Sequence, residues 1–330
     1  MAKRKHITEI ALGFFSGGVM LLHPKDIRNI DQQSPKHAEL AEDCHIYLIV
    51  KRPRVSYVPN SLVIGGGQTV GKMKYAVSGI AQEFTFRLQG EPNAERIEIS
   101  EYPHTKLSLI RDGEVAASIP AHLMSMICDH VDDQAVRDLE VQYVGMSYAG
   151  GRRSAKDRLQ SHSTLQQVLA DLSSDSPESE ALLVLAQYEP PQALITFDGR
   201  DKSLRLEDDR DLMGALRRQQ QEVTEDLRIA LIEAALIKYF QPLYNDKYKK
   251  RFPNPTQKIL DEVYSIDFGA LTVELNTEDL NARLFSRARK PGHHHIASFD
   301  LHDPAERRSF FNIMNLPSGS DAPDFSGPVF

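Results

Sequence analysis

The chain of 330 residues contains little cysteine, no excess of positive charge and no long apolar run. Its two cysteines, Cys44 and Cys128, lie far apart, which excludes a disulfide framework and a cysteine zinc cluster. The formal net charge of −7 excludes a basic nucleic-acid coat, and a hydrophobic content of 41% excludes a wholly disordered chain. Any surface that binds a polyanion must therefore be local.

The apolar stretch Ile10–Leu22 follows Lys3, Arg4 and Lys5, which is the order of charged and apolar residues in a signal peptide. Glu9 borders the stretch, two glycines interrupt it and no small-x-small cleavage site follows, so a buried strand or helix is the favoured interpretation. The stretch is also too short for a membrane-spanning helix, which needs about 20 residues. We therefore expect a cytoplasmic protein that has no membrane as a partner.

The hydrophobic pattern predicts an α+β fold in three parts. Residues 1–135 are expected to form a β-rich N-terminal domain that could serve as a recognition module, because short β-branched and aromatic runs alternate with turn residues. Residues 136–252 are expected to form a small mixed sheet with flanking helices. Residues 253–330 are expected to form a small β-containing C-terminal extension that ends in a loose tail.

Individual elements follow from the same pattern. The predicted helices are Ala121–Val131, a broken pair over Ser154–Leu172 and a mostly buried helix over Asp211–Tyr239 that ends before Pro242. Ser173–Glu180 is predicted to be a loop. The predicted strands are His45–Arg52, Ser61–Ile64, Glu83–Leu88, Arg96–Ile99, Lys106–Arg111, Leu139–Val144, a hairpin of Ala181–Tyr188 with Gln192–Phe197, and Ala270–Leu275, Ala282–Ser286 and His295–Leu301.

Candidate chemistry begins with Tyr143-Val144-Gly145, at the end of a predicted strand. Such a strand holds a phenol at a sheet edge, and its glycine lets a backbone or ligand approach closely. Arg158 and His162 are four residues apart, so on one helix they share a face and could both meet an anionic group.

A lone carboxylate, Glu233, stands among apolar residues of the long predicted helix. Burying it without a partner would be costly, so something must compensate its charge. A structural salt bridge, for example to Arg158, could do so.

Taken together, these segments resemble the GIY-YIG nuclease superfamily. Tyr143-Val144-Gly145 resembles the second half of the name motif, Arg158 with His162 resembles the arginine helix, and Glu233–Asn245 resembles the late helix with its metal-binding glutamate. The family carries a first tyrosine, in Gly-Ile-Tyr, shortly before Tyr-x-Gly, whereas residues 132–139 contain no tyrosine. His45-Ile46-Tyr47 has matching letters, but it would require a long insertion between two paired strands.

The resemblance implies a divalent-metal-dependent endonuclease that hydrolyses phosphodiester bonds in DNA. Glu233 would hold Mg²⁺ or Mn²⁺, and Arg158 would stabilise the charge that develops on the phosphate. Tyr143 would orient or deprotonate the attacking water, with His162 as a helper or alternative base. Asn245 is expected to have a structural role at the end of the helix. A function in restriction or phage defence is compatible with such a nuclease, although no residue demonstrates it.

Two local sets of basic residues fit this interpretation. If the fold is correct, they border one concave face beside Gly145 and contact backbone phosphates. As an alternative, they are solvated loop charges. The two sets are Arg152, Arg153 and Lys156, and Lys247, Lys249, Lys250 and Arg251.

Three other interpretations remain open. The protein could be a catalytically inactive nucleic-acid-binding or scaffold protein of the same fold, with a protein partner or a second copy bound through its N-terminal domain. Gly66–Lys72 nearly matches a phosphate-binding P-loop, although Met73 stands where Ser or Thr is required, and a glycine-rich β-turn is the alternative. His293, His294 and His295, with His302, could bind a transition metal or form an exposed turn.

Overall fold

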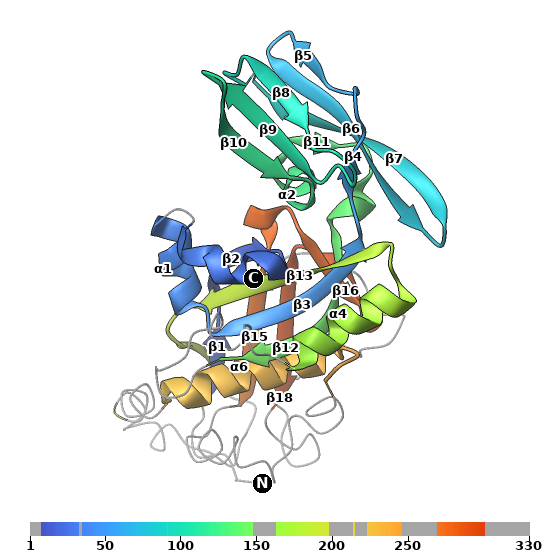
Figure 1. Cartoon of the computed structure of the whole chain (residues 1–330). Coiled ribbons are helices and arrows are strands. Elements are labelled where there is room, and N and C mark those ends of the chain that lie inside the picture. The colour runs from blue at the N-terminus through green and yellow to red at the C-terminus, as the bar shows by residue number, and fades with distance from the viewer. Residues whose placement is uncertain are drawn as a thin grey trace.

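The computed structural model describes residues 8–32, 35–90, 92–147, 163–197, 214, 223–245 and 269–300. The described strands form four sheets (Figure 1), and a six-stranded sheet, here called the central sheet, shares one apolar cluster with a four-stranded sheet, here called the back sheet. The other two sheets, of five and three strands, stand above them in Figure 1. The mixed α+β class that the sequence predicts is confirmed, with strands in the majority.

The central sheet has six strands in the order β17-β16-β12-β3-β13-β2. β3 lies in the middle and pairs antiparallel with both β12 and β13. Each long predicted strand of this sheet is present, with bounds that differ by one or two residues. The strands are β2 (Ser16–Leu22), β3 (Ile46–Pro53), β12 (Asp138–Met146), β13 (Ser179–Tyr188), β16 (Arg283–Ser286) and β17 (Arg289–Gly292).

Side chains of β3 alternate between two apolar clusters because successive residues of a strand point to opposite faces. Leu48 and Val50 belong to the first cluster, which fills the space between the central sheet and the back sheet. Tyr47 and Ile49 belong to the second cluster, on the other face. The central sheet is therefore buried on both sides, which explains why β3 and β13 are almost continuously apolar.

The back sheet has the order β14-β1-β15-β18. Its strands are β1 (Thr8–Phe14), β14 (Gln192–Phe197), β15 (Ala270–Asn276) and β18 (His294–Asp300). The predicted hairpin of Ala181–Tyr188 with Gln192–Phe197 is wrong, because β13 pairs with β2 in the central sheet and β14 pairs with β1 in the back sheet. The prolines between β13 and β14 mark a bend from one sheet into the other rather than a reversal of the chain.

The first two strands bend in the same way. β1 and β2 are separated only by Phe15, and the carboxylate of Glu274 accepts hydrogen bonds from both the backbone N–H (2.9 Å) and the hydroxyl (2.8 Å) of Ser16. These contacts fix the backbone at the bend. The apolar stretch Ile10–Leu22 thus forms two buried strands that cross between the sheets, in agreement with the buried-strand interpretation.

Residues 54–137, here called the inserted segment, lie between β3 and β12 and form the other two sheets. One has the order β11-β7-β6-β4 with β5 paired to β6, and the other has the order β10-β9-β8. Its elements are β4 (Ser56–Tyr57), β5 (Val63–Gly65), β6 (Gln68–Val77), β7 (Ile80–Gln89), β8 (Arg96–Ile99), β9 (Lys106–Arg111), β10 (Glu114–Pro120), α2 (Ala121–Ile127), β11 (His130–Val131) and the 3₁₀ helix η2 (Gln134–Arg137).

The sheets do not follow the three predicted parts of the chain. The central sheet combines β2 and β3 from residues 1–135, β12 and β13 from residues 136–252, and β16 and β17 from residues 253–330. The C-terminal strands are therefore integrated into the central sheet and the back sheet and do not form a separate extension. Alternating patterns predict strands, but they do not state which strands pair.

The helices cover the two faces of the central sheet. The described helical elements outside the inserted segment are η1 (Pro24–Gln32), α1 (Pro35–Asp43), α4 (Ser163–Asp175), α6 (Glu225–Phe240) and η4 (Glu278–Leu280). α4 packs on the second cluster and α6 on the first. The predicted loop Ser173–Glu180 is too long, because α4 continues to Asp175 and β13 begins at Ser179. α6 begins after Thr224, whose hydroxyl accepts the N–H of Leu227 at 3.3 Å.

Gly66 and Gly67 form the tight turn between β5 and β6, and both have positive φ angles of 64° and 76°. Two such residues in succession suit the two-residue turn of a hairpin, and glycine adopts them without strain. Lys72 then lies exposed on β6, 3.6 Å from the carboxylate of Glu83. The segment therefore forms the glycine-rich turn and not a phosphate-binding loop, which would lead into a helix.

No described helix has the length and apolar character that a membrane-spanning segment needs.

Arg52 connects the inserted segment to the central sheet, and its side chain is fully buried on β3. Its Nε donates to the carboxylate of Glu180 on β13 at 3.0 Å. Its other nitrogens donate to the hydroxyl of Ser125 (2.9 Å) and to the backbone oxygens of Val136 (2.9 Å) and His122 (2.7 Å). One guanidinium thereby joins β3, β13, α2 and η2.

Replacing Arg52 by methionine is expected to lower the free energy of unfolding by about 3 to 5 kcal/mol, because it leaves Glu180 buried without its cation and removes the donor to three oxygens. Urea unfolding of the full chain measures the loss. Arg54→Met is the matched control, because Arg54 is exposed, and we expect a change within about 0.5 kcal/mol. Equal effects of the two substitutions would contradict the role assigned to Arg52.

His295 on β18 is only 4% exposed and packs edge-on against Phe240 of α6. Its Nε2 lies 3.1 Å from the oxygen of Leu284 and 3.0 Å from that of Gly292, so this nitrogen carries the hydrogen. Its Nδ1 lies 3.3 Å from the hydroxyl of Tyr239, which can donate to it. Burial lowers the pKa of His295 to about 4.

The low pKa predicts a loss of stability in acid. Since the folded pKa lies below the ordinary value of 6.5, the contribution of neutral His295 is complete above pH 6.5 and is lost as the pH falls towards 4. His295→Gln should reduce the slope of unfolding free energy against pH in this range by up to about 1.4 kcal/mol per pH unit. The same urea titrations of the wild-type protein give the reference slope. An unchanged slope in His295→Gln would show that another group titrates.

Candidate functional site

Tyr47 and Tyr143 lie side by side on two paired strands. In the antiparallel register of β3 and β12, Tyr143 is opposite Ile49, and Gly145 is opposite Tyr47. The two phenol rings have centroids 6.1 Å apart and an interplanar angle of 32°. Tyr47 is fully buried, whereas Tyr143 is half-buried. The chain between them is the inserted segment, so residues far apart in the sequence meet directly.

A β-bulge in β12 orients Tyr143. The register shifts between Val141 and Tyr143, so that Val141 and Val144 both face the first cluster while Tyr143 faces the second. Without the extra residue, strict alternation would put Tyr143 on the same face as Val141. Bulges of this kind are frequent beside active sites, where they redirect a side chain.

Gly145 is required by the two tyrosines. A Cβ atom at this position would lie 2.5 Å from Cζ and Oη of Tyr47 and 2.6 Å from Cε1 of Tyr143. Both rings therefore lie over the bare backbone of Gly145. The glycine of the Tyr-x-Gly motif has a steric purpose here, which agrees with the close approach that the sequence suggests.

Asn245 fastens the segment after α6 to the open edge of β12. Its side-chain oxygen accepts the N–H of Val144 and its side-chain nitrogen donates to the oxygen of Val144, both at 2.8 Å. The adjacent N–H of Tyr244 donates to the oxygen of Gln142 at 3.0 Å. Asn245 is itself buried, and this geometry is the structural role expected of it.

Tyr244 completes an aromatic group on the face of the central sheet that α4 covers. It packs against the second cluster, as Tyr143 does, and its hydroxyl donates to the carboxylate of Asp171 on α4 at 2.6 Å. Burial, together with this hydrogen bond and the charge of Asp171, raises the pKa of Tyr244 to about 12. Its phenol is therefore a hydrogen-bond donor at neutral pH and ties α4 to the edge of β12.

Glu233 lies on α6 and is half-buried. Its neighbours Ile232 and Ala234 belong to the first cluster, so α6 packs on the face of the central sheet opposite to the two tyrosines. The chain crosses to the tyrosine face between Phe240 and Tyr244. Because Glu233 is only half-buried, it remains open to solvent. Its approach to Tyr143 stays a prediction.

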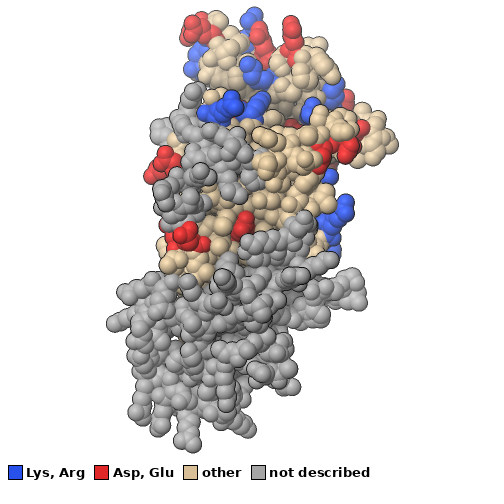
Figure 2. Space-filling view, turned by 60° about the horizontal axis from the view of Figure 1, so that its bottom comes forward, with Lys and Arg blue, Asp and Glu red and all other residues tan. Residues whose placement is uncertain are grey.

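The other predicted site residues lie outside the described residues. They are Arg152, Arg153, Lys156, Arg158 and His162, between β12 and α4, and Lys247, Lys249, Lys250 and Arg251, after Asn245. Over the described part of the face in Figure 2, Lys and Arg side chains are interspersed with Asp and Glu and do not form one basic surface.

Within the described ranges, no group of three or more His, Cys, Asp or Glu side chains is arranged to hold a metal ion. His293 and His295 bind backbone oxygens of the loop and strand beside them, and His294 lies 3.0 Å from the carboxylate of Glu274. His302 lies outside the described residues. These three histidines therefore have structural partners. A cation held by Glu233 alone would not need such a group, because water and phosphate oxygens can complete its coordination.

Sequence reasoning undervalued Tyr47, Tyr244 and Asp171. The letters His-Ile-Tyr gave a signal for Tyr47, but only the pairing of β3 with β12 gives it weight. The pairing of Tyr244 with Asp171 had no sequence signal, because their hydrogen bond joins the segment after α6 to α4 and the sequence does not relate these two parts.

Comparisons with models of protein families, with curated proteins and with solved structures find no match to this chain.

Replacing Gly145 by alanine is expected to lower the free energy of unfolding by about 1 to 3 kcal/mol, because the added methyl group displaces both tyrosine rings. Urea unfolding measures the loss, and near-ultraviolet circular dichroism reports the displaced tyrosines. Gly292→Ala is the control, because a Cβ atom there meets its nearest neighbour at an ordinary 3.7 Å. A Gly145→Ala protein as stable as this control would refute the crowding.

Proposed function

We propose that this protein is a divalent-metal-dependent endonuclease that hydrolyses phosphodiester bonds in DNA on a GIY-YIG-like core. The observation that carries the proposal is the meeting of His45-Ile46-Tyr47 and Tyr143-Val144-Gly145 on paired strands, with Gly145 opposite Tyr47. Such pairing is the condition under which the first tyrosine motif could lie so far upstream.

Two further features support the same core. β12, α4, β13 and α6 follow one another in the strand, helix, strand and helix order of the resemblance, with β14 added between β13 and α6. The inserted segment accounts for the distance between β3 and β12. The bulge in β12 also turns Tyr143 towards the face of the central sheet that α4 covers, and the chain between β12 and α4 connects to this face. That chain contains Arg158 and His162, so a phosphate contact on this side is expected from them.

The residues of the chain would divide the chemistry as follows. Arg158 would bind two phosphate oxygens and stabilise developing negative charge, since a guanidinium remains cationic and binds in a bidentate manner. Tyr143 would orient or deprotonate the attacking water, with His162 as a helper. Tyr47, which is buried against Tyr143, would position that ring rather than touch substrate.

Glu233 is the carboxylate that would hold Mg²⁺ or Mn²⁺, because its side chain is half-buried and remains open to solvent. A bound cation of this kind lowers the pKa of a water molecule and neutralises charge on the phosphate. The chain continues from α6 to Asn245, whose side chain is hydrogen-bonded to Val144, the residue after Tyr143.

DNA contacts are expected from the two predicted basic sets rather than from the inserted segment. The inserted segment contains eight Lys and Arg residues against ten Asp and Glu residues, so it lacks the excess charge of a general phosphate-binding surface. We propose that it recognises a protein partner or a second copy of the chain, or contributes shape to substrate binding.

A second candidate is a catalytically inactive nucleic-acid-binding protein of the same fold. The position of α6 favours it, because the helix that carries Glu233 packs on the face of the sheet opposite to Tyr47 and Tyr143. A cation on Glu233 would then have to reach the tyrosines around the edge of β12.

Plasmid cleavage with Mg²⁺ or Mn²⁺ distinguishes the two candidates. We expect Tyr143→Phe to reduce the cleavage rate by about 100-fold or more, since it removes the hydroxyl that acts on water. Glu233→Gln should abolish cleavage and leave DNA binding intact, because it removes one charge from the metal site without changing its size.

Matched controls are Tyr102→Phe, at a tyrosine that is 88% exposed, and Glu278→Gln, at an exposed glutamate outside α6. Both should cleave at the wild-type rate. Cleavage that survives Tyr143→Phe and Glu233→Gln would refute the site. A wild-type protein that binds DNA but does not cleave it under any of these metal conditions would establish the second candidate.

A further inference from the structure

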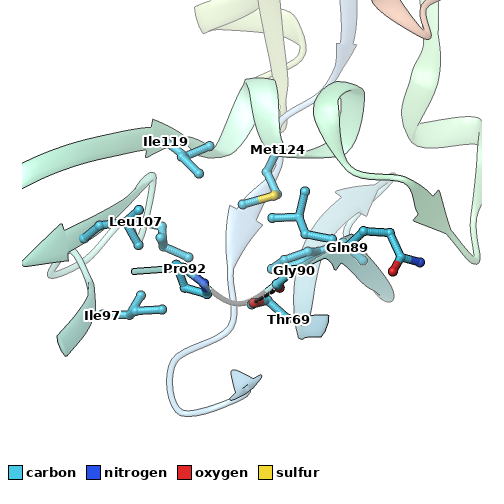
Figure 3. Close-up of a pocket in the computed structure, with 11 residues that line it drawn as sticks. Thr69, Gln89, Gly90, Pro92, Ile97, Leu107, Ile119 and Met124 are labelled. Carbon is cyan, nitrogen blue, oxygen red and sulfur yellow. Dashed lines mark hydrogen bonds between the residues drawn. The ribbon is translucent and has the colours of Figure 1, made fainter. Parts of the chain in front are cut away.

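The inserted segment encloses an apolar pocket of about 190 Å³ between its two sheets. One wall consists of Phe86 and Leu88 of β7, and the facing wall consists of Ile97 and Leu109 of β8 and β9. Met124 of α2 enters from the third side, as Figure 3 shows. Several wall residues are only partly buried, so the space is open to solvent.

Polar groups at the rim of the pocket are already paired. The hydroxyl of Thr69 donates to the oxygen of Gly90 at 3.2 Å, and the N–H of Gly90 donates to the oxygen of Gly67 at 2.7 Å. The amide of Gln89 points away from the pocket centre in Figure 3. None of the described residues that line the pocket is charged. The described lining therefore presents mainly apolar side chains to a ligand.

The size of the pocket distinguishes it from an ordinary packing defect. Protein interiors contain few voids larger than a water molecule, because their side chains interdigitate. An apolar cavity of about 150 Å³ stays dry and binds benzene, since water finds no hydrogen-bond partners in it. The pocket between these sheets opens to solvent, but it is larger and its lining is likewise mainly apolar.

We propose that this pocket is a binding site for a small, uncharged, apolar ligand that contains one or two fused aromatic rings. The site is separate from the tyrosine pair, and the proposal does not depend on nuclease activity. A ring would fill the space between Phe86 and Ile97, and the paired polar rim would exclude charged molecules because it offers them no counter-charge.

Indole is a direct probe, because the chain contains no tryptophan and indole emission therefore reports on the ligand alone when excitation avoids tyrosine. We expect saturable binding with a blue shift of indole emission, and displacement by toluene but not by benzoate. Ile119→Phe, which places a larger side chain on the pocket wall, should weaken indole binding at least tenfold. Val63→Phe is the control, because Val63 is 67% exposed on the same segment and does not line the pocket.

A second measurement protects the test against misfolding of Ile119→Phe. In the wild-type protein, nuclear Overhauser effects should connect toluene ring protons to the methyl groups of Leu88, Ile97 and Met124. The absence of saturable indole binding by the wild type would overturn the proposal. Equal binding by wild type and a folded Ile119→Phe, or contacts of toluene only with methyl groups outside the pocket lining, would do the same.

Discussion

The buried guanidinium of Arg52 holds together the two parts of this molecule. It lies at the end of β3, where the chain leaves the central sheet to form the inserted segment, and it binds Glu180 on the next strand. Its remaining donors are used by Ser125, His122 and Val136, all within the inserted segment. Because each partner is buried, the charge can be satisfied only when both parts adopt this arrangement.

That arrangement lets a long insertion leave and re-enter one sheet without disturbing it. β3 and β12 pair as neighbours although the inserted segment separates them in the sequence. The entropic cost of closing a loop rises only slowly with loop length. The long inserted segment therefore adds little to the cost of pairing β3 with β12. The tyrosine pair therefore forms as if the two strands followed each other directly.

α2 contributes to both the pocket and the connection to the central sheet. Met124 lines the apolar space of the inserted segment, and the next residue, Ser125, accepts a hydrogen bond from Arg52. Arg52 is on the strand that carries Tyr47. The pocket, the buried cation and the tyrosine pair are thus joined by consecutive contacts through one short helix and one strand.

The sequence by itself determined the local elements and the residue types of the site. Periodicity predicted β3, β8, β9 and β12 closely, because each is a strong apolar pattern. It also predicted the C-terminal end of α6, which Pro242 marks, but not its beginning at Glu225. Tyr143, Gly145 and Asn245 were identified as residues of interest because their segments resemble motifs of the GIY-YIG nuclease superfamily. Strand partners could not be predicted in the same way, since backbone hydrogen bonds carry no residue identity.

Only the tertiary structure decided what these residues meet. It separated β13 from β14, turned Tyr143 through a bulge that no pattern reveals, and placed Tyr47 over Gly145. It also placed α6 on the other face of the sheet. The physical reason is that alternation and helical period describe each segment against an unspecified interior, whereas pairing and packing depend on the side-chain volumes of all segments at once.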